Sequence, residues 1–295
     1  MSADSKISIV FTDSGLGGLS VMVMFYKGLL ERLSYIKADK IELVFFNALP
    51  ENGQGYNRMG SMQLKVDTFN RALQEMESLY NPDAIAIACN TLSAVYPLTP
   101  FALKSRETFE IISSGRYLIN QQRRKEPEIP VFAIATPTTV WSGAYEMNDP
   151  QVMQVSGANL ASQIEMDHNG KDVKETLGVI FNKIKTLTSQ KEIVLFLGCT
   201  HYGYIEDILL KESKKYDLQV NRIINPNVEF SMELLNATIP IEKEKIKKTP
   251  EVSIRIESQA LIDPSEIKSI RDLIMSESPE IANLLENYTH LSKSF

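Results

Sequence analysis

The chain has 295 residues, a formal net charge of −6 at pH 7 and an apolar fraction of 43%. This length suits two domains or one large one, and the acidic balance argues against a nucleic-acid-binding surface. No apolar stretch reaches the roughly 18 residues of a membrane span, and no signal-peptide pattern opens the sequence. We therefore expect a cytoplasmic protein that binds a small molecule and neither nucleic acid nor membrane.

Only two cysteines occur, Cys89 and Cys199, and each directly follows a short apolar run, AIAIA at 84–88 and IVLFLG at 193–198. Such short runs predict strands buried on both faces of a parallel sheet. The residues that follow would lie at the carboxyl edge of the sheet, where open α/β sheets bind ligands. A helix N-terminus next to each thiol would favour its thiolate. In the cytoplasm two thiols are expected rather than a disulfide, and their spacing predicts no metal site.

The first half of the chain predicts a glycine-rich turn and a long loop between strands. Strands are expected at residues 6–12, 41–47, 84–88 and 109–113, with helices at 63–80 and 116–124. The turn DSGLGG at residues 13–18 is neither a dinucleotide fingerprint nor a P-loop. Asp13 either caps the helix that follows or exchanges a proton with a nearby thiol. The loop at 48–62 is long for a βα connection, which is often a sign of function.

The second half repeats this pattern. Strands are expected at residues 130–136, 152–156, 193–198 and 220–225, with a helix at 177–187. A repeat of roughly 110 residues indicates a duplicated domain. A helix at 228–235, a strand at 252–257 and a helical tail from 264 are expected to pack back onto the first half. We therefore predict an α/β fold with two pseudo-symmetric, doubly wound parallel-sheet domains, 1–103 with 223–295 and 104–222, and an active site in the cleft between them.

Two thiols on opposed domains suit one reaction in particular. Inverting the α-carbon of an amino acid requires a base on one face of that carbon and an acid on the other. One residue cannot serve both faces, whereas two equivalent thiols can, because thiols titrate near neutrality in a suitable environment. No lysine with a phosphate-binding cup for pyridoxal phosphate is recognisable, so we expect no cofactor.

Four stretches in order resemble the aspartate/glutamate racemase family, and the glutamate racemases most closely. They are FTDSGLGGLSV at 11–21, ACNTLSA at 88–94, ATPTTVWSGAY at 135–145 and LGCTHY at 197–202. The resemblance implies a cofactor-independent, two-base racemase that interconverts L- and D-glutamate and supplies D-glutamate for peptidoglycan. It also implies a cytoplasmic homodimer.

The resemblance implies a role for each matched residue. Cys89 and Cys199 would be the two acid/bases, with Asp13 tuning Cys89 and His201 tuning Cys199. Glu165 lies about where the family carries a glutamate near the second thiol. The residues that would hold the carboxylates and ammonium of the substrate are Ser14, Asn90, Thr91, Thr136, Thr139 and Thr200.

Taken alone, several of these residues also fit a structural role. Glu165 would then be an exposed helix residue, and His201 would be satisfied by backbone groups at a helix start. Asn90, Thr91 and Thr200 would cap helices.

The loop after the second strand departs from the family. There the family starts at an aspartate and carries Pro-Tyr-Gly, whose backbone helps to bind the substrate. This chain starts at Asn47, and either residues 55–57 or residues 50–53 align with Pro-Tyr-Gly. Ala135 stands where the family usually has glycine. The alternatives are therefore a racemase of aspartate or another small acidic substrate, or a catalytically silent binding protein of the same fold, although the two thiols and Asp13 argue against the last.

Overall fold

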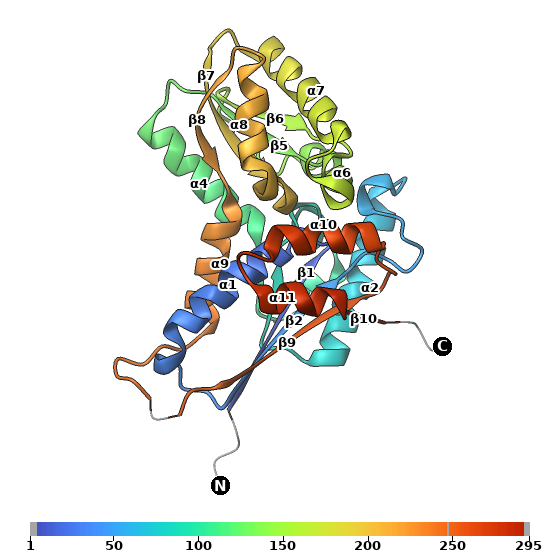
Figure 1. Cartoon of the computed structure of the whole chain (residues 1–295), viewed down its shortest axis with the longest axis vertical. Helices are drawn as coiled ribbons and strands as arrows, with labels where there is room; N and C mark the ends of the chain where they lie inside the picture. Colours follow the sequence, from blue (N-terminus) through green and yellow to red (C-terminus); the bar gives the residue numbers. More distant parts are fainter. Residues whose placement is uncertain (1–4, 247, 292–295) are drawn as a thin grey trace.

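Two parallel sheets, each flanked by helices, form the body of the molecule (Figure 1). The structure is a computed structural model that describes residues 5–246 and 248–291. The first sheet has six strands in the order β10-β9-β2-β1-β3-β4, and the second has four in the order β6-β5-β7-β8. All the paired strands named here run parallel. The predicted α/β fold with two parallel-sheet domains is therefore confirmed.

The first sheet is built from both ends of the chain. Its strands are β1 (Lys6–Asp13), β2 (Lys40–Asn47), β3 (Ala84–Ile87), β4 (Thr108–Glu110), β9 (Glu251–Ser258) and β10 (Thr289–His290). The helices around it are α1 (Leu19–Arg32), α2 (Met62–Tyr80), α3 (Asn90–Val95), α9 (Pro226–Thr238), α10 (Pro264–Ile274) and α11 (Pro279–Glu286). β9 pairs with β2 along its whole length, so the C-terminal part of the chain extends the first sheet.

The second sheet comes from the middle of the chain. Its strands are β5 (Val131–Ala135), β6 (Val152–Ser156), β7 (Glu192–Gly198) and β8 (Gln219–Ile224). Its helices are α4 (Ile111–Lys125), α5 (Pro137–Trp141), α6 (Leu160–Asp167), α7 (Lys171–Leu187), the 3-10 helix η5 (Thr200–Ile205) and α8 (Glu206–Lys214). The order β6-β5-β7-β8 repeats the order β2-β1-β3-β4 of the first sheet. The predicted duplication is therefore visible in the strand order.

Each central strand buries both of its faces, which explains its continuous apolar sequence. In β1, Ile9 and Phe11 join the core between the sheet and α1, whereas Val10 joins the core beneath α2. In β7, Leu195 and Phe196 likewise lie in two different cores. This burial fixes the strand ends, and hence the positions of the polar residues that follow them.

The predicted strand at residues 109–113 is wrong in its second half. β4 ends at Glu110, and α4 begins at Ile111. The carboxylate of Glu110 accepts hydrogen bonds from the backbone N–H of Ile112 (2.9 Å) and of Ser113 (3.0 Å). This cap starts a helix within an apolar, β-branched run, and Ile111 and Ile112 pack into separate cores on its flanks.

The points where the chain crosses between domains follow from the sheet pairing. β4 pairs with β3, so residues 108–110 extend the first sheet beyond the predicted limit of 103. β8 continues to Ile224 in the second sheet, slightly past the predicted limit of 222. We therefore propose that the crossings lie at the start of α4 and at the start of α9.

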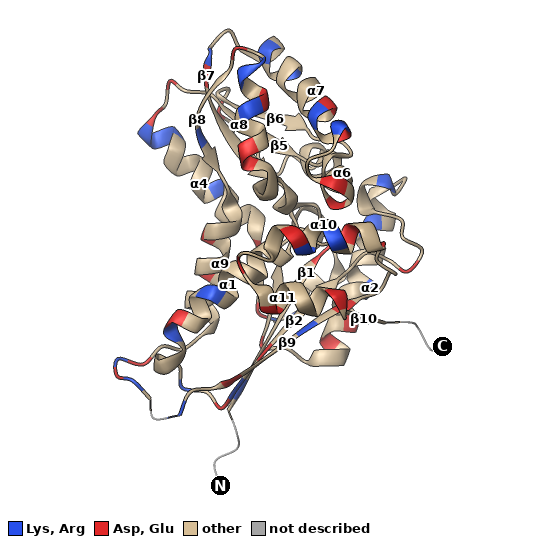
Figure 2. Cartoon of the chain, viewed as in Figure 1, with Lys and Arg blue, Asp and Glu red and all other residues tan. Residues whose placement is uncertain are grey.

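Charged residues of both signs are spread over the two domains in the view of Figure 2. Blue and red segments alternate along α7 and α8, and no helix in this view is blue along its length. None of the described helices combines the length and the apolar character that crossing a membrane requires.

Candidate active site

Residues from both domains meet where the strands β1, β3, β5 and β7 end. β1 ends at Asp13, and Cys89 lies between β3 and α3. In the second domain Cys199 lies between β7 and η5. The hydroxyl of Thr200 donates a hydrogen bond to Oδ2 of Asp13 (2.9 Å), so the residue next to the second cysteine contacts the strand end of the first domain.

The glycine-rich turn at residues 13–18 allows this close approach. A Cβ atom on Gly17 would lie 2.4 Å from Nδ1 of His201, and one on Gly15 would lie 2.5 Å from Oε1 of Glu165. A side chain at either position would displace these groups, so glycine lets the turn approach them closely. Oε1 of Glu165 also accepts a hydrogen bond from the backbone N–H of Leu16 (2.7 Å). The turn therefore serves as the contact surface for the second domain.

One interpretation of the turn was that Asp13 caps α1, and the structure contradicts it. The cap position of α1 is Gly18, without a side-chain hydrogen bond. Asp13 instead is buried beside Thr200, and burial raises the pKa of its carboxyl against the lowering effects of His201 and the Thr200 hydroxyl. Its Oδ1 atom has no hydrogen-bond partner among the described residues.

The first thiol lies in an electronegative environment. Cys89 is 5% exposed, and its Sγ atom lies 3.2 Å from Oγ of Ser14. Burial, followed by the negative charge of Asp13, raises the pKa of the Cys89 thiol well above its usual value. Both effects disfavour a negative sulfur, because burial removes hydration and the carboxylate repels the thiolate. Cys89 is therefore expected to carry its proton at neutral pH.

The second thiol faces a cation. Sγ of Cys199 lies 3.6 Å from Nδ1 of His201, and Nε2 of the same ring lies 2.7 Å from Oε1 of Glu165. Burial tends to lower the pKa of His201, but the charges of Glu165 and Cys199 and their hydrogen bonds raise it well above its usual value. Burial tends to raise the pKa of Glu165, but His201 and the backbone N–H of Leu16 keep it lowered. The pair is therefore an imidazolium and a carboxylate at neutral pH.

These contacts decide between the alternative readings of Glu165 and His201. The side chain of Glu165 is 13% exposed and forms an ion pair with His201, so the exposed-helix reading is wrong. His201 contacts two side chains and not merely the backbone of a helix start.

A series of hydroxyl groups connects α3 of the first domain to α5 of the second. Oγ1 of Thr136 lies 2.7 Å from Oγ1 of Thr91 and 3.0 Å from Oγ1 of Thr139. The cap position of α3 is Cys89, and no side chain caps this helix. Asn90 accepts a hydrogen bond from the hydroxyl of Tyr145. Its Nδ2 atom is buried without a partner among the described residues. Buried donors are normally hydrogen-bonded, so this atom is available to bind a ligand.

Sequence reasoning did not single out Tyr145 or Lys65, and it named Asn57 only within residues 55–57 of the loop. Tyr145 closes the matched stretch at 135–145 and is fully buried, but its partner Asn90 lies in the other half of the sequence. Oδ1 of Asn57 accepts a hydrogen bond from the backbone N–H of Thr138 (3.0 Å). Residues 55–57 of the long loop therefore contact α5, whereas residues 51–53 are exposed to solvent.

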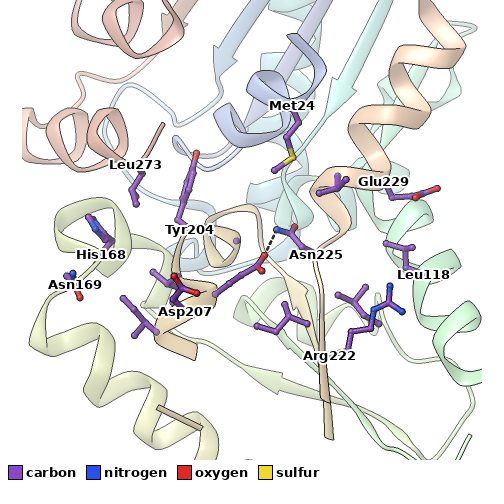
Figure 3. A pocket seen from close by; sticks show the side chains of 17 residues that line it. Met24, Leu118, His168, Asn169, Tyr204, Asp207, Arg222, Asn225, Glu229 and Leu273 are labelled. Carbon is purple, nitrogen blue, oxygen red and sulfur yellow. Dashed lines mark hydrogen bonds between the residues drawn. The ribbon is translucent and has the colours of Figure 1, made fainter. Parts of the chain in front are cut away.

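A separate cavity of about 800 Å³ lies between the domains and has neither cysteine in its wall (Figure 3). Tyr204, Asp207, Asn225 and Glu229 are among its lining residues, and Asn225 donates a hydrogen bond to Glu206 there (2.8 Å). Within residues 5–246 and 248–291 no group of three or more His, Cys, Asp or Glu side chains has the geometry of a metal site.

Comparison with known proteins relates the chain to glutamate racemases. No protein-family model matches it. It is 26% identical over 260 residues to a glutamate racemase of Leptospira interrogans, covering 81% of this chain and 93% of that one. It is 28% identical over 202 residues to that of Lactobacillus acidophilus, covering 66% and 68%. These relatives support the assignment to the glutamate racemase family that the four motifs predict.

Solved structures share the fold. The crystal structure of a glutamate racemase isoform from Bacillus anthracis matches with a TM-score of 0.66 at 19% identity, over 93% of this chain and 94% of that one. The glutamate racemase of Francisella tularensis in complex with D-glutamate matches with a TM-score of 0.62 at 21% identity, over 92% and 95%.

The ion pair between His201 and Glu165 predicts an unusual titration. The His201 imidazole should titrate well above the usual pKa of 6.5, because the charge of Glu165 outweighs burial, which alone would lower that pKa. In the Glu165→Gln variant this pKa should fall. Imidazole resonances followed by NMR from pH 5 to pH 9 provide the measurement, and titration of His201 near pH 6.5 in the parent protein would contradict the assignment.

The same pair should contribute to stability within a limited pH window. The lowered pKa of Glu165 contributes stability above about pH 4.5, and the raised pKa of His201 contributes it below about pH 6.5. The loss of unfolding free energy in Glu165→Gln should therefore be largest between these values and diminish as the pH rises through the raised pKa. The control is Glu175→Gln, which removes an exposed pair with Lys171 and should have little effect.

Proposed function

We propose that the chain is a cofactor-independent racemase that interconverts L- and D-glutamate through two thiols. The observation that supports this most strongly is the contrast between the two buried cysteines. Cys89 lies near the carboxylate of Asp13, whereas Cys199 faces the imidazolium of His201. One thiol is thus set to hold a proton while the other has a counter-ion for a negative sulfur. A two-base reaction needs one acid and one base at the same time.

In the direction from L to D, the thiolate of Cys199 takes the α-proton and the thiol of Cys89 gives its proton to the opposite face of the same carbon. The enzyme is left with a thiol at Cys199 and a thiolate at Cys89. His201 and Asp13 then exchange protons with solvent or substrate to restore the starting state. In the direction from D to L the same groups act in reverse order.

Two buried atoms that have no hydrogen-bond partner in the described part of the chain suit the polar groups of an amino acid. Oδ1 of Asp13 can accept a hydrogen bond from the substrate ammonium, and Nδ2 of Asn90 can donate one to the α-carboxylate. The remaining contacts would come from Ser14 beside the first thiol and Thr200 beside the second, together with the hydroxyl series of Thr91, Thr136 and Thr139. Such fixed donors stabilise the negative charge that develops as the proton leaves.

The wider role of the protein rests on the resemblance to glutamate racemases. We propose that it supplies D-glutamate for peptidoglycan in the cytoplasm and acts as a homodimer. A racemase of aspartate is the alternative within the same chemistry, and a silent binding protein of this fold is the alternative outside it.

Circular dichroism of L-glutamate incubated with the pure protein, without added cofactor, tests the proposed activity. The optical signal should decay to zero with the parent protein. Cys89→Ser and Cys199→Ser should each lower kcat by about 100-fold or more, because each removes one of two required proton-transfer groups. A variant that racemises at the parent rate would refute the two-thiol mechanism, and decay with L-aspartate alone would favour the alternative substrate. Thermal melts of both variants verify that they fold.

The two tuning residues should affect the two directions unequally. His201→Asn should lower kcat mainly from L to D, and Asp13→Asn mainly from D to L, by about 10- to 100-fold. The equilibrium ratio of the enantiomers is one, so kcat/KM must fall equally in both directions and the difference can appear only in kcat and KM separately. Initial rates from each pure enantiomer decide this, and equal kcat losses in both directions for both variants would exclude these roles.

A further inference from the structure

We propose that Lys65, near the start of α2, binds the side-chain carboxylate of the substrate and so selects acidic amino acids. This inference rests on the proposed racemase function and names the chemical class of its substrate. It begins from a contact between the domains that the reaction itself does not use.

Lys65 reaches from the first domain to the second. It lies one turn into α2, directly after the long loop, and its Nζ atom donates a hydrogen bond to Oγ1 of Thr138 in α5 (2.7 Å). Thr138 is 2% exposed. It stands between Thr136 and Thr139, which form the hydroxyl series at the boundary of the domains. The ammonium group of Lys65 thus contacts the residue that stands in the chain between two threonines proposed to bind the substrate.

The charge of Lys65 is not compensated by the protein. Burial alone lowers the pKa of its ammonium group, and no charged neighbour contributes to that shift. None of the ion pairs found within the described residues includes Lys65. A partly buried cation without a carboxylate is costly, and an anion that binds next to it recovers that cost. An amino acid with a neutral side chain would leave the cation uncompensated.

The hydrogen bonds around Thr138 leave one donor for such an anion. The backbone N–H of Thr138 is already bound by Oδ1 of Asn57, and its hydroxyl oxygen accepts from Lys65. No described residue accepts the hydroxyl proton of Thr138, which can therefore donate to a ligand. A carboxylate placed here would accept from both Lys65 and Thr138, in a charge-assisted arrangement that is stronger than one between neutral groups.

Other basic residues near the loop do not occupy this position. The guanidinium of Arg71 donates to the hydroxyl of Thr68, within α2 itself. Arg58 is exposed and lines a pocket that Asp167 and Glu266 also line.

The test compares Lys65→Met, Lys65→Arg and Lys40→Met with the parent protein. Lys40 is a partly exposed lysine at the start of β2, at the opposite edge of the sheet from the thiols, and serves as the matched control. Rates with L-glutamate and with L-glutamine, which has the same length but no charge, are measured for each protein. Lys65→Met should raise KM for glutamate about 10- to 100-fold with a smaller change in kcat, as expected for loss of a charged hydrogen bond.

The effect should be specific to the charge. Glutamine kinetics should change little in Lys65→Met, Lys65→Arg should restore most of the affinity for glutamate, and Lys40→Met should behave as the parent. Unchanged glutamate kinetics in Lys65→Met, or an equal loss for glutamate and glutamine, would overturn the assignment.

Calorimetric binding of D-glutamate and D-glutamine separates this inference from the proposed activity. A parent protein that racemises neither glutamate nor aspartate would refute the racemase function. Tighter binding of D-glutamate than of D-glutamine by the parent, lost in Lys65→Met, would still support the carboxylate site. Equal binding of the two ligands by the parent, or binding of neither, would overturn it.

Discussion

The close contact between the glycine turn of the first domain and three side chains of the second is the constraint on which the site depends. Gly15 and Gly17 lack the side-chain atoms that would displace Glu165 and His201. At this turn the backbone N–H of Leu16 donates a hydrogen bond to the carboxylate of Glu165, and the carboxylate of Asp13 accepts one from the hydroxyl of Thr200. These contacts hold the carboxyl edges of two separate sheets together. The groups beside the two thiols are therefore linked across the domain boundary, Asp13 to Thr200 and Glu165 to the turn.

Duplication explains where the thiols lie, and divergence explains why they differ. The same strand order places each cysteine after the third strand of its half. The first half provides a carboxylate at the end of its first strand, Asp13, whereas Thr136 follows the equivalent strand of the second half. The second half instead provides the ion pair of His201 and Glu165. The two halves thus share a fold but surround their cysteines with groups of opposite charge, a carboxylate near Cys89 and an imidazolium near Cys199.

Local patterns in the sequence predicted the strands apart from the short β10 and placed both thiols at strand ends, because buried parallel strands have a distinctive composition. They failed at Ile111, where the cap formed by Glu110 starts a helix in a run that resembles a strand. They left Glu165 undecided, since an isolated helix residue shows no sign of a partner 36 positions away. Lys65 was missed for the same reason, because its contact with Thr138 exists only once the domains meet.

Proton transfer from opposite faces is the central claim, and the fate of solvent deuterium tests it most directly. L-glutamate incubated with the parent protein in D2O is analysed in the first turnovers by chiral separation and mass spectrometry. Two separate thiols predict that each D-glutamate formed carries one deuterium at the α-carbon while the remaining L-glutamate stays protiated. D-glutamate that retains the original proton would contradict the account, because it would show that a single group removes and returns the same proton.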